Sequence, residues 1–232
     1  MRKEIIIPVK LWLIELASIF VLIVGSIAGT FLITRYSTIK EIGTVNSEWF
    51  VIKEKELDLN GFQNKYKDFL SDEKAQYIVE VCNGFGLDPD IAVAILAVEN
   101  PTVNENAINR KNLNKTIDIG LFQLNDRSLY EKGGFLDQWW TFDSKDNFDP
   151  FNWKHNAYIA IQYMNLLKNT FGEKNPYWIA AGYNAGITRA QASYFESHGK
   201  KNTDDKLPTS TRDYYAPSVE NNYKRWHSME NY

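Results

Sequence analysis

The chain has 232 residues, which is enough for one domain of ordinary size and a membrane-anchoring segment. Its formal net charge is −3, whereas an electrostatic nucleic-acid binder normally needs a basic face, so we expect no nucleic-acid partner. The one cysteine, Cys82, excludes an intramolecular disulfide and is predicted to be buried in the core. The three histidines lack metal-ligand spacing, and the sequence therefore predicts no metal site.

The N-terminal part of the chain carries one long apolar run. Residues 11–34 hold a single charge, Glu15. A membrane-spanning helix needs about 20 apolar residues, and a cleavable signal usually has an apolar core of only about 7–15. The length favours an uncleaved transmembrane anchor, and the alternative is a signal peptide cleaved after Ala28. The slight excess of basic residues before the run predicts that residues 1–10 are cytoplasmic and that the rest lies outside.

The remainder divides into a linker and a domain. Residues 35–60 mix polar and charged residues with scattered apolar ones, which is typical of a stalk. From residue 61 to residue 232 the apolar positions recur at helical spacing and strand signals are weak, so the fold class is predicted to be mainly α. The first clear helix covers 72–82 and is broken by the glycines of 83–86.

A second helix has clear start signals. Asp88 is placed to cap it and Pro89 to occupy its first position. The residues from 91 to 99 are apolar on nearly every face, which predicts a buried helix. Further helices are predicted from Asp149-Pro150 to Thr170, over 177–181 and over 187–197, and a loop over 207–215 leads into a last one.

Glu99 ends the apolar helix. A carboxylate in that position is partly desolvated, which raises its pKa and can keep it protonated near neutral pH. Cleavage of a glycosidic bond needs such an acid, because the leaving oxygen must receive a proton. On the local pattern alone, a helix-end glutamate facing solvent is the alternative interpretation.

Five segments in order resemble the catalytic domain of the soluble lytic transglycosylases, which are grouped with goose-type lysozyme-like enzymes. The segments are Glu99-Asn100, Gly120-Leu121-Phe122-Gln123, Asp149-Pro150, Ala181-Gly182-Tyr183-Asn184-Ala185-Gly186, and Pro208 with Thr211-Arg212-Asp213-Tyr214. The resemblance spans roughly 75–225 and implies a lysozyme-like α-helical domain with a substrate cleft. The implied substrate is peptidoglycan, cut at the β-1,4 bond between N-acetylmuramic acid and N-acetylglucosamine with a 1,6-anhydro product.

The resemblance also assigns roles. It makes Glu99 the acid and then the base, without a metal or cofactor. It implies that four residues bind the glycan or orient Glu99: Gln123, Tyr183, Asn184 and Tyr214. Asn109 stands where a substrate-contacting serine is common, and Phe122 replaces a frequent methionine as an apolar wall. Asn100 and Ser210 differ from the usual serine and glutamate, which leaves the details of substrate contact open.

Asp118 keeps two alternatives open. The sequence Asp118-x-Gly120-x-x-Gln123 also resembles the second-carboxylate segment of animal-type lysozymes, which would favour hydrolysis. The plainer interpretation is an aspartate that caps a turn after Thr116. A third hypothesis is a non-catalytic module that binds peptidoglycan within an envelope or secretion complex. The aromatic cluster from Trp139 to Trp153 either stacks on sugar rings or packs between helices.

Overall fold

The computed structural model describes residues 59–112, 114–172, 175–201 and 206–231. The predicted cytoplasmic segment, the predicted anchor and residues 35–58 of the predicted stalk lie outside the described residues. Within the described ranges, no helix combines the length and the apolar character that crossing a membrane requires. The described helices and strands all belong to one compact unit, which comprises Glu56–Trp140 and Ser144–Tyr232.

Three helices open this unit: α2 (Leu59–Tyr66), α3 (Asp72–Phe85) and α4 (Pro89–Glu99). Helix α3 runs three residues beyond its predicted end, because Gly86 rather than Gly84 adopts the left-handed conformation that closes it (φ 64°). The predicted start of α4 is confirmed, since the Asp88 side chain accepts a hydrogen bond from the Asp90 amide at 2.9 Å. Cys82 is fully buried in α3, which confirms its prediction as a core residue.

A small antiparallel sheet follows α4, in a region where strand signals are weak in the sequence. Its strands are β1 (Ile108–Asn109), β2 (Asp118–Ile119) and β3 (Leu124–Asn125), in that order across the sheet. The register pairs Asn109 with Asp118, and Asp118 with Asn125. Directly paired residues point to the same face of a sheet, so the three polar side chains gather on one face.

Short helices α5 (Asp126–Tyr130), α6 (Phe135–Trp139) and η1 (Lys145–Asn147) lead to the long helix α7 (Trp153–Phe171). The prediction that α7 begins at Asp149-Pro150 is wrong by three to four residues. Asn152 caps the helix, because its side chain accepts hydrogen bonds from the amides of Lys154 and His155. A capping side chain fixes where the helical backbone starts, and the Asp-Pro pair therefore lies in the preceding turn.

All the regular elements that the structure describes after α7 are helices. Its elements are α8 (Pro176–Ala185), α9 (Ile187–Glu196), the π-helix η2 (Thr211–Tyr215), α10 (Ala216–His227) and η3 (Ser228–Asn231). Helix α8 includes Tyr183 and Asn184, which the sequence placed in a turn. The helix continues to Ala185 and ends at Gly186, whose φ of 86° an L side chain rarely adopts.

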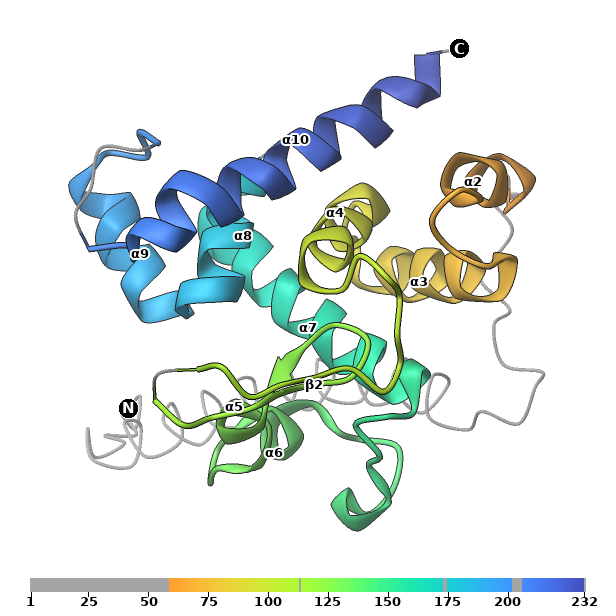
Figure 1. Ribbon diagram of the computed structural model, residues 1–232, viewed down its shortest axis with the longest axis horizontal. Helices are drawn as coiled ribbons and strands as arrows, with labels where there is room; N and C mark the ends of the chain where they lie inside the picture. The colour runs from red at the N-terminus through yellow and green to blue at the C-terminus, as the bar shows by residue number, and fades with distance from the viewer. Residues whose placement is uncertain (1–58, 113, 173–174, 202–205, 232) are drawn as a thin grey trace, which may run out of the picture. The chain divides into compact units, whose positions relative to one another are not determined.

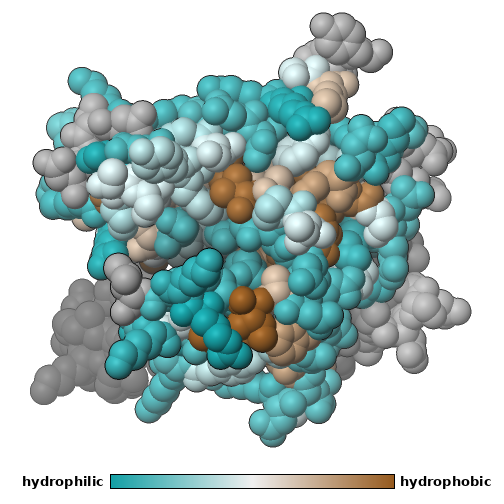
Figure 2. All heavy atoms as spheres, in the orientation of Figure 1, coloured by the Kyte–Doolittle hydropathy of each residue, from teal (hydrophilic) through white to brown (hydrophobic). Residues whose placement is uncertain are grey.

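The core forms around α4, whose residues from Ile91 to Leu96 are fully buried. Helix α4 packs against α3 and α10, while α7 packs against α3 and α8, so the described fold is mainly α. In the view of Figure 1, the sheet, α5 and α6 lie below α7, and α4 and α10 lie above it. On the face drawn in Figure 2, hydrophilic residues cover most of the surface and apolar residues gather in a few small groups.

Candidate functional site

Glu99 is the last residue of α4 and is half-buried there. Burial raises the pKa of Glu99 to about 8, the hydrogen bond from Tyr215 acts to lower it, and the negative charge of Asp118 raises it further. This direction is the one that the end of an apolar helix predicts. A carboxyl group with such a pKa carries its proton at neutral pH and can donate it.

Tyr215 supplies the hydrogen bond to Glu99. Its hydroxyl donates to Glu99 Oε1 at 2.5 Å, and burial together with the charge of Glu99 raises the tyrosine pKa, so the hydroxyl keeps its proton. The residue predicted from the sequence motif was Tyr214, which is 71% exposed. The two tyrosines lie in the π-helix, whose wider turn sets which of them faces α4, and π-turns often mark functional sites.

We expect Tyr215→Phe to raise the titration midpoint of Glu99 above that of the parent protein. The hydroxyl stabilises the ionised carboxylate, and its removal therefore makes ionisation harder. The measurement is the carbon chemical shift of the Glu99 carboxyl group, followed by nuclear magnetic resonance as the pH is varied. Tyr214→Phe is the matched control, and the same upward shift in both variants would contradict the assignment.

Tyr183 and Asn184 come from the end of α8. The Tyr183 hydroxyl donates to the Phe122 carbonyl at 2.9 Å, and burial, followed by the charge of Glu99, raises the tyrosine pKa. Asn184 is exposed, and its Oδ1 accepts a hydrogen bond from the buried Thr211 hydroxyl at 2.6 Å. Asn184 therefore ties α8 to the π-helix that carries Tyr215.

The segment that follows β2 makes a tight turn. Gly120 has a φ of 78°, and a Cβ there would lie 2.3 Å from the Pro150 carbonyl oxygen, so the position requires glycine. The Gln123 amide donates to the carbonyls of Gly120 (2.8 Å) and Ala107 (3.2 Å). The Phe122 ring is fully buried, so this residue faces the site with its backbone carbonyl.

Two buried asparagines hold this segment, and neither had a role predicted from the sequence. Asn100, which follows Glu99, donates through Nδ2 to the Leu121 carbonyl at 3.1 Å and the Asn104 carbonyl at 2.7 Å. Asn156 of α7 accepts a hydrogen bond from the Phe122 amide at 2.7 Å. Asn100 thus stands in place of the usual serine after the glutamate, and its side chain donates a hydrogen bond to the backbone of the Gly120–Gln123 motif. A polar residue on the apolar face of α7 was the available signal for Asn156.

Asp118 is held by side-chain amides. Its carboxylate accepts hydrogen bonds from Asn109 (3.2 Å), Asn112 (2.9 Å) and Asn125 (2.9 Å). A turn-capping aspartate would accept a hydrogen bond from a backbone N–H. The three donors to Asp118 named here are side-chain amides instead, which differs from the turn cap suggested by the sequence. Asn109 was predicted to contact substrate, and its side-chain Nδ2 donates a hydrogen bond to Asp118.

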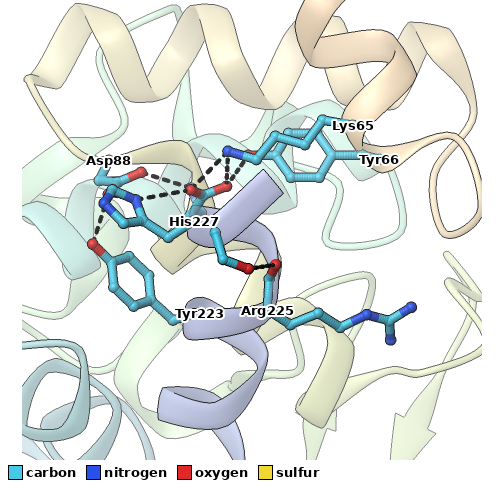
Figure 3. A network of polar contacts seen from close by, with 8 residues as sticks. Lys65, Tyr66, Asp88, Tyr223, Arg225 and His227 are labelled. Carbon is cyan, nitrogen blue, oxygen red and sulfur yellow. Dashed lines mark hydrogen bonds and ion pairs between the residues drawn. The ribbon is translucent and has the colours of Figure 1, made fainter. Parts of the chain in front are cut away.

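A second polar network lies at the start of α4 (Figure 3). The buried Asp90 accepts hydrogen bonds from the Tyr66 hydroxyl at 2.6 Å and from Lys65 at 2.8 Å, and His227 Nδ1 lies 3.3 Å from it. Asp88, Asp90 and His227 are also close enough together to hold a metal ion, which sequence spacing did not suggest. The Lys65 ammonium already forms an ion pair with Asp90. The network is therefore well explained by electrostatic contacts that join α2, α4 and α10.

The chain was compared with known proteins in three ways. The family model described as "Transglycosylase SLT domain" matches residues 76–206, which is more than half of the 232 residues. The matched range includes Glu99, Asp118, Asn156 and Tyr183, and ends before Tyr215. Neither the curated proteins nor the solved structures gave a match.

Proposed function

This chain belongs to the transglycosylase SLT domain family, and we propose that it is a lytic transglycosylase acting on peptidoglycan. The bond cut is the β-1,4 linkage between N-acetylmuramic acid and N-acetylglucosamine, and the product carries a 1,6-anhydro-muramyl end. The observation that carries the proposal is Glu99, a site carboxyl group whose pKa is raised to about 8 within the matched domain.

In the proposed reaction one carboxyl group acts twice. Protonated Glu99 donates its proton to the glycosidic oxygen, and the bond from that oxygen to the anomeric carbon breaks. The resulting carboxylate takes the proton of the muramyl 6-hydroxyl, whose oxygen bonds to the anomeric carbon and closes the anhydro ring. The neighbouring N-acetyl group assists at that carbon. The Tyr215 hydroxyl stabilises the carboxylate between the two proton transfers.

The rival is hydrolysis with Asp118 as a second carboxylate. It is favoured by one observation, since the charge of Asp118 acts on Glu99 and raises its pKa. Against it, both Asp118 oxygens already accept hydrogen bonds from side-chain amides, which leaves fewer free lone pairs to hold a water. A lytic reaction needs no second carboxylate, because the sugar supplies its own hydroxyl.

We expect Asp118→Asn to lower the cleavage rate by less than about tenfold, which is about 1.4 kcal/mol of barrier. The new amide turns one hydrogen-bond acceptor into a donor facing the surrounding amides, so the variant should lose stability more than activity. Rates are measured on purified glycan strands and stability by urea unfolding. A drop of about a thousandfold, together with reducing-end products from the parent protein, would make Asp118 the second catalytic carboxylate.

The proposal itself is tested by incubating the purified protein with peptidoglycan sacculi. Release of soluble muropeptides supports it, whereas sacculi that bind the protein and stay intact would identify a binding module instead. Such a module could still serve an envelope or secretion complex.

We propose that residues 11–34 anchor the chain in the cell membrane with the SLT domain on the extracytoplasmic side. Support comes from the length of the apolar run. The protein should therefore stay with membranes through a high-salt wash and dissolve only in detergent. N-terminal sequencing of the mature protein checks the alternative, because a start at Gly29 would show a cleaved signal and a secreted protein.

A further inference from the structure

The end of β2 and the turn after it have an unusual set of hydrogen bonds from side chains to backbone carbonyls. Four consecutive carbonyl oxygens, of residues 119–122, each accept a hydrogen bond from a side chain. Asn156 donates to Ile119 at 2.9 Å, Gln123 to Gly120 at 2.8 Å, Asn100 to Leu121 at 3.1 Å, and Tyr183 to Phe122 at 2.9 Å. We call the four side chains the carbonyl clamp. Buried carbonyl oxygens need hydrogen-bond partners, and because the clamp supplies one to each of these four it fixes the segment in place.

Asn156 is the member of the clamp that touches the segment at both ends. It is fully buried in the first turn of α7. Its Oδ1 accepts from the Phe122 amide at 2.7 Å, and its Nδ2 donates to the Ile119 carbonyl and to the Pro150 carbonyl at 3.1 Å. A Cβ at Gly120 would lie 2.4 Å from Asn156 Nδ2, so the glycine is what allows this close approach.

The segment connects Asn156 to the surroundings of Glu99 along two routes. The Leu121 carbonyl holds Asn100, which is the next residue after Glu99 in the chain. The Phe122 carbonyl holds the hydroxyl of Tyr183, which lies within the electrostatic reach of Glu99. A shift of the segment would move both neighbours of the acid, and displacement of about 1 Å can cost about a hundredfold in rate.

We propose that Asn156 is a positioning residue for glycan cleavage: by fixing residues 119–122 it keeps Asn100 and Tyr183 in place beside Glu99. This inference rests on the proposed function. Asn156 itself is too deeply buried to meet a glycan, and it acts through the segment.

Four variants test the proposal: Asn156→Ala, Asn156→Asp, Tyr183→Phe, and Asn156→Ala combined with Tyr183→Phe. The side chain in Asn156→Asp has nearly the same shape and can still accept the hydrogen bond from the Phe122 amide, but as a carboxylate it cannot donate to the Ile119 and Pro150 carbonyls. This variant therefore replaces Asn156→Ala if the alanine variant fails to fold. Asn169→Ala is the matched control, since Asn169 is exposed on the same helix. The measurements are kcat and KM on purified glycan strands, and amide hydrogen exchange at Phe122.

The expected result is a loss of at least about tenfold in kcat for both Asn156 variants, with KM changed by less than about threefold. The double variant should be no more than about threefold slower than Asn156→Ala alone, because both residues act through one segment. As the pH falls, the Asn156→Asp variant should recover activity relative to the parent, since its protonated carboxyl group donates again. Exchange at Phe122 should be at least about tenfold faster in Asn156→Ala and unchanged in Asn169→Ala.

Two results would overturn the positioning role: kcat within twofold of the parent in folded Asn156 variants, or effects of Asn156→Ala and Tyr183→Phe that multiply in the double variant. If the parent protein cleaves no glycan, it is the proposed function that fails. Hydrogen exchange at Phe122 then still decides whether Asn156 fixes the segment, because an unchanged rate in Asn156→Ala would exclude it.

Discussion

Glu99→Gln is expected to lower peptidoglycan cleavage by about 10²–10⁴-fold, which is the contribution typical of a general acid–base group. The amide keeps the shape of the side chain and can still accept the hydrogen bond from Tyr215. It cannot give a proton to the glycosidic oxygen and then take one from the muramyl hydroxyl. The check is the rate of muropeptide release by the purified variant. Glu131→Gln, which alters an exposed glutamate at the end of α5, is the control.

The same variant has a predicted stability signature. In the folded protein the pKa of Glu99 is raised to about 8, compared with an ordinary value of 4.5. Between these two values the folded state binds more protons than the unfolded state, so the raised pKa lowers stability as the pH rises through this window. Glu99→Gln removes that loss, and the variant should gain stability over the parent near pH 8 but not near pH 4. Near-normal cleavage by a folded variant would remove Glu99 from its role.

Gly120→Ala is expected to destabilise the domain by at least about 3 kcal/mol, and to abolish activity with it. The added Cβ would lie 2.3 Å from the Pro150 carbonyl oxygen and 2.4 Å from Asn156 Nδ2, and a hydrogen bond from that Nδ2 to that oxygen holds both neighbours in place. The backbone must also keep a φ of 78°, which an alanine adopts only with strain. Urea unfolding of the purified variant measures the effect.

Gly133→Ala separates the two causes of that loss. Gly133 has nearly the same φ, 77°, but a Cβ there would meet nothing within 4 Å. It should therefore cost only the backbone strain, about 1–2 kcal/mol. Equal losses in the two variants would show that the close packing around Gly120 is unimportant.

Local signals predicted the helix that carries the acid. The Asp88-Pro89 start, the apolar run and the terminal Glu99 all lie within twelve consecutive residues, and each acts on the backbone near it. The boundary of α7 was less predictable, because Asp149-Pro150 and Asn152 are competing start signals and the side-chain cap of Asn152 decides.

The surroundings of the acid depend on contacts between distant segments. Tyr215 lies 116 residues from Glu99, and only the π-turn decides that it, rather than Tyr214, meets the carboxylate. The amides around Asp118 come from β1, from the loop after it and from β3, and their convergence follows from the sheet register. Asn156 stands out in the sequence only as a polar residue on the apolar face of α7, and its partners become known only when the turn at Gly120 is placed against it.

In the proposed reaction Glu99 directs an intramolecular attack within the glycan. It is tested most directly by mass spectrometry of the fragments that the purified parent protein releases from glycan strands. The expected fragments carry 1,6-anhydro-muramyl ends, each lighter by one water than the corresponding reducing end. Reducing ends instead would contradict it and show a hydrolase.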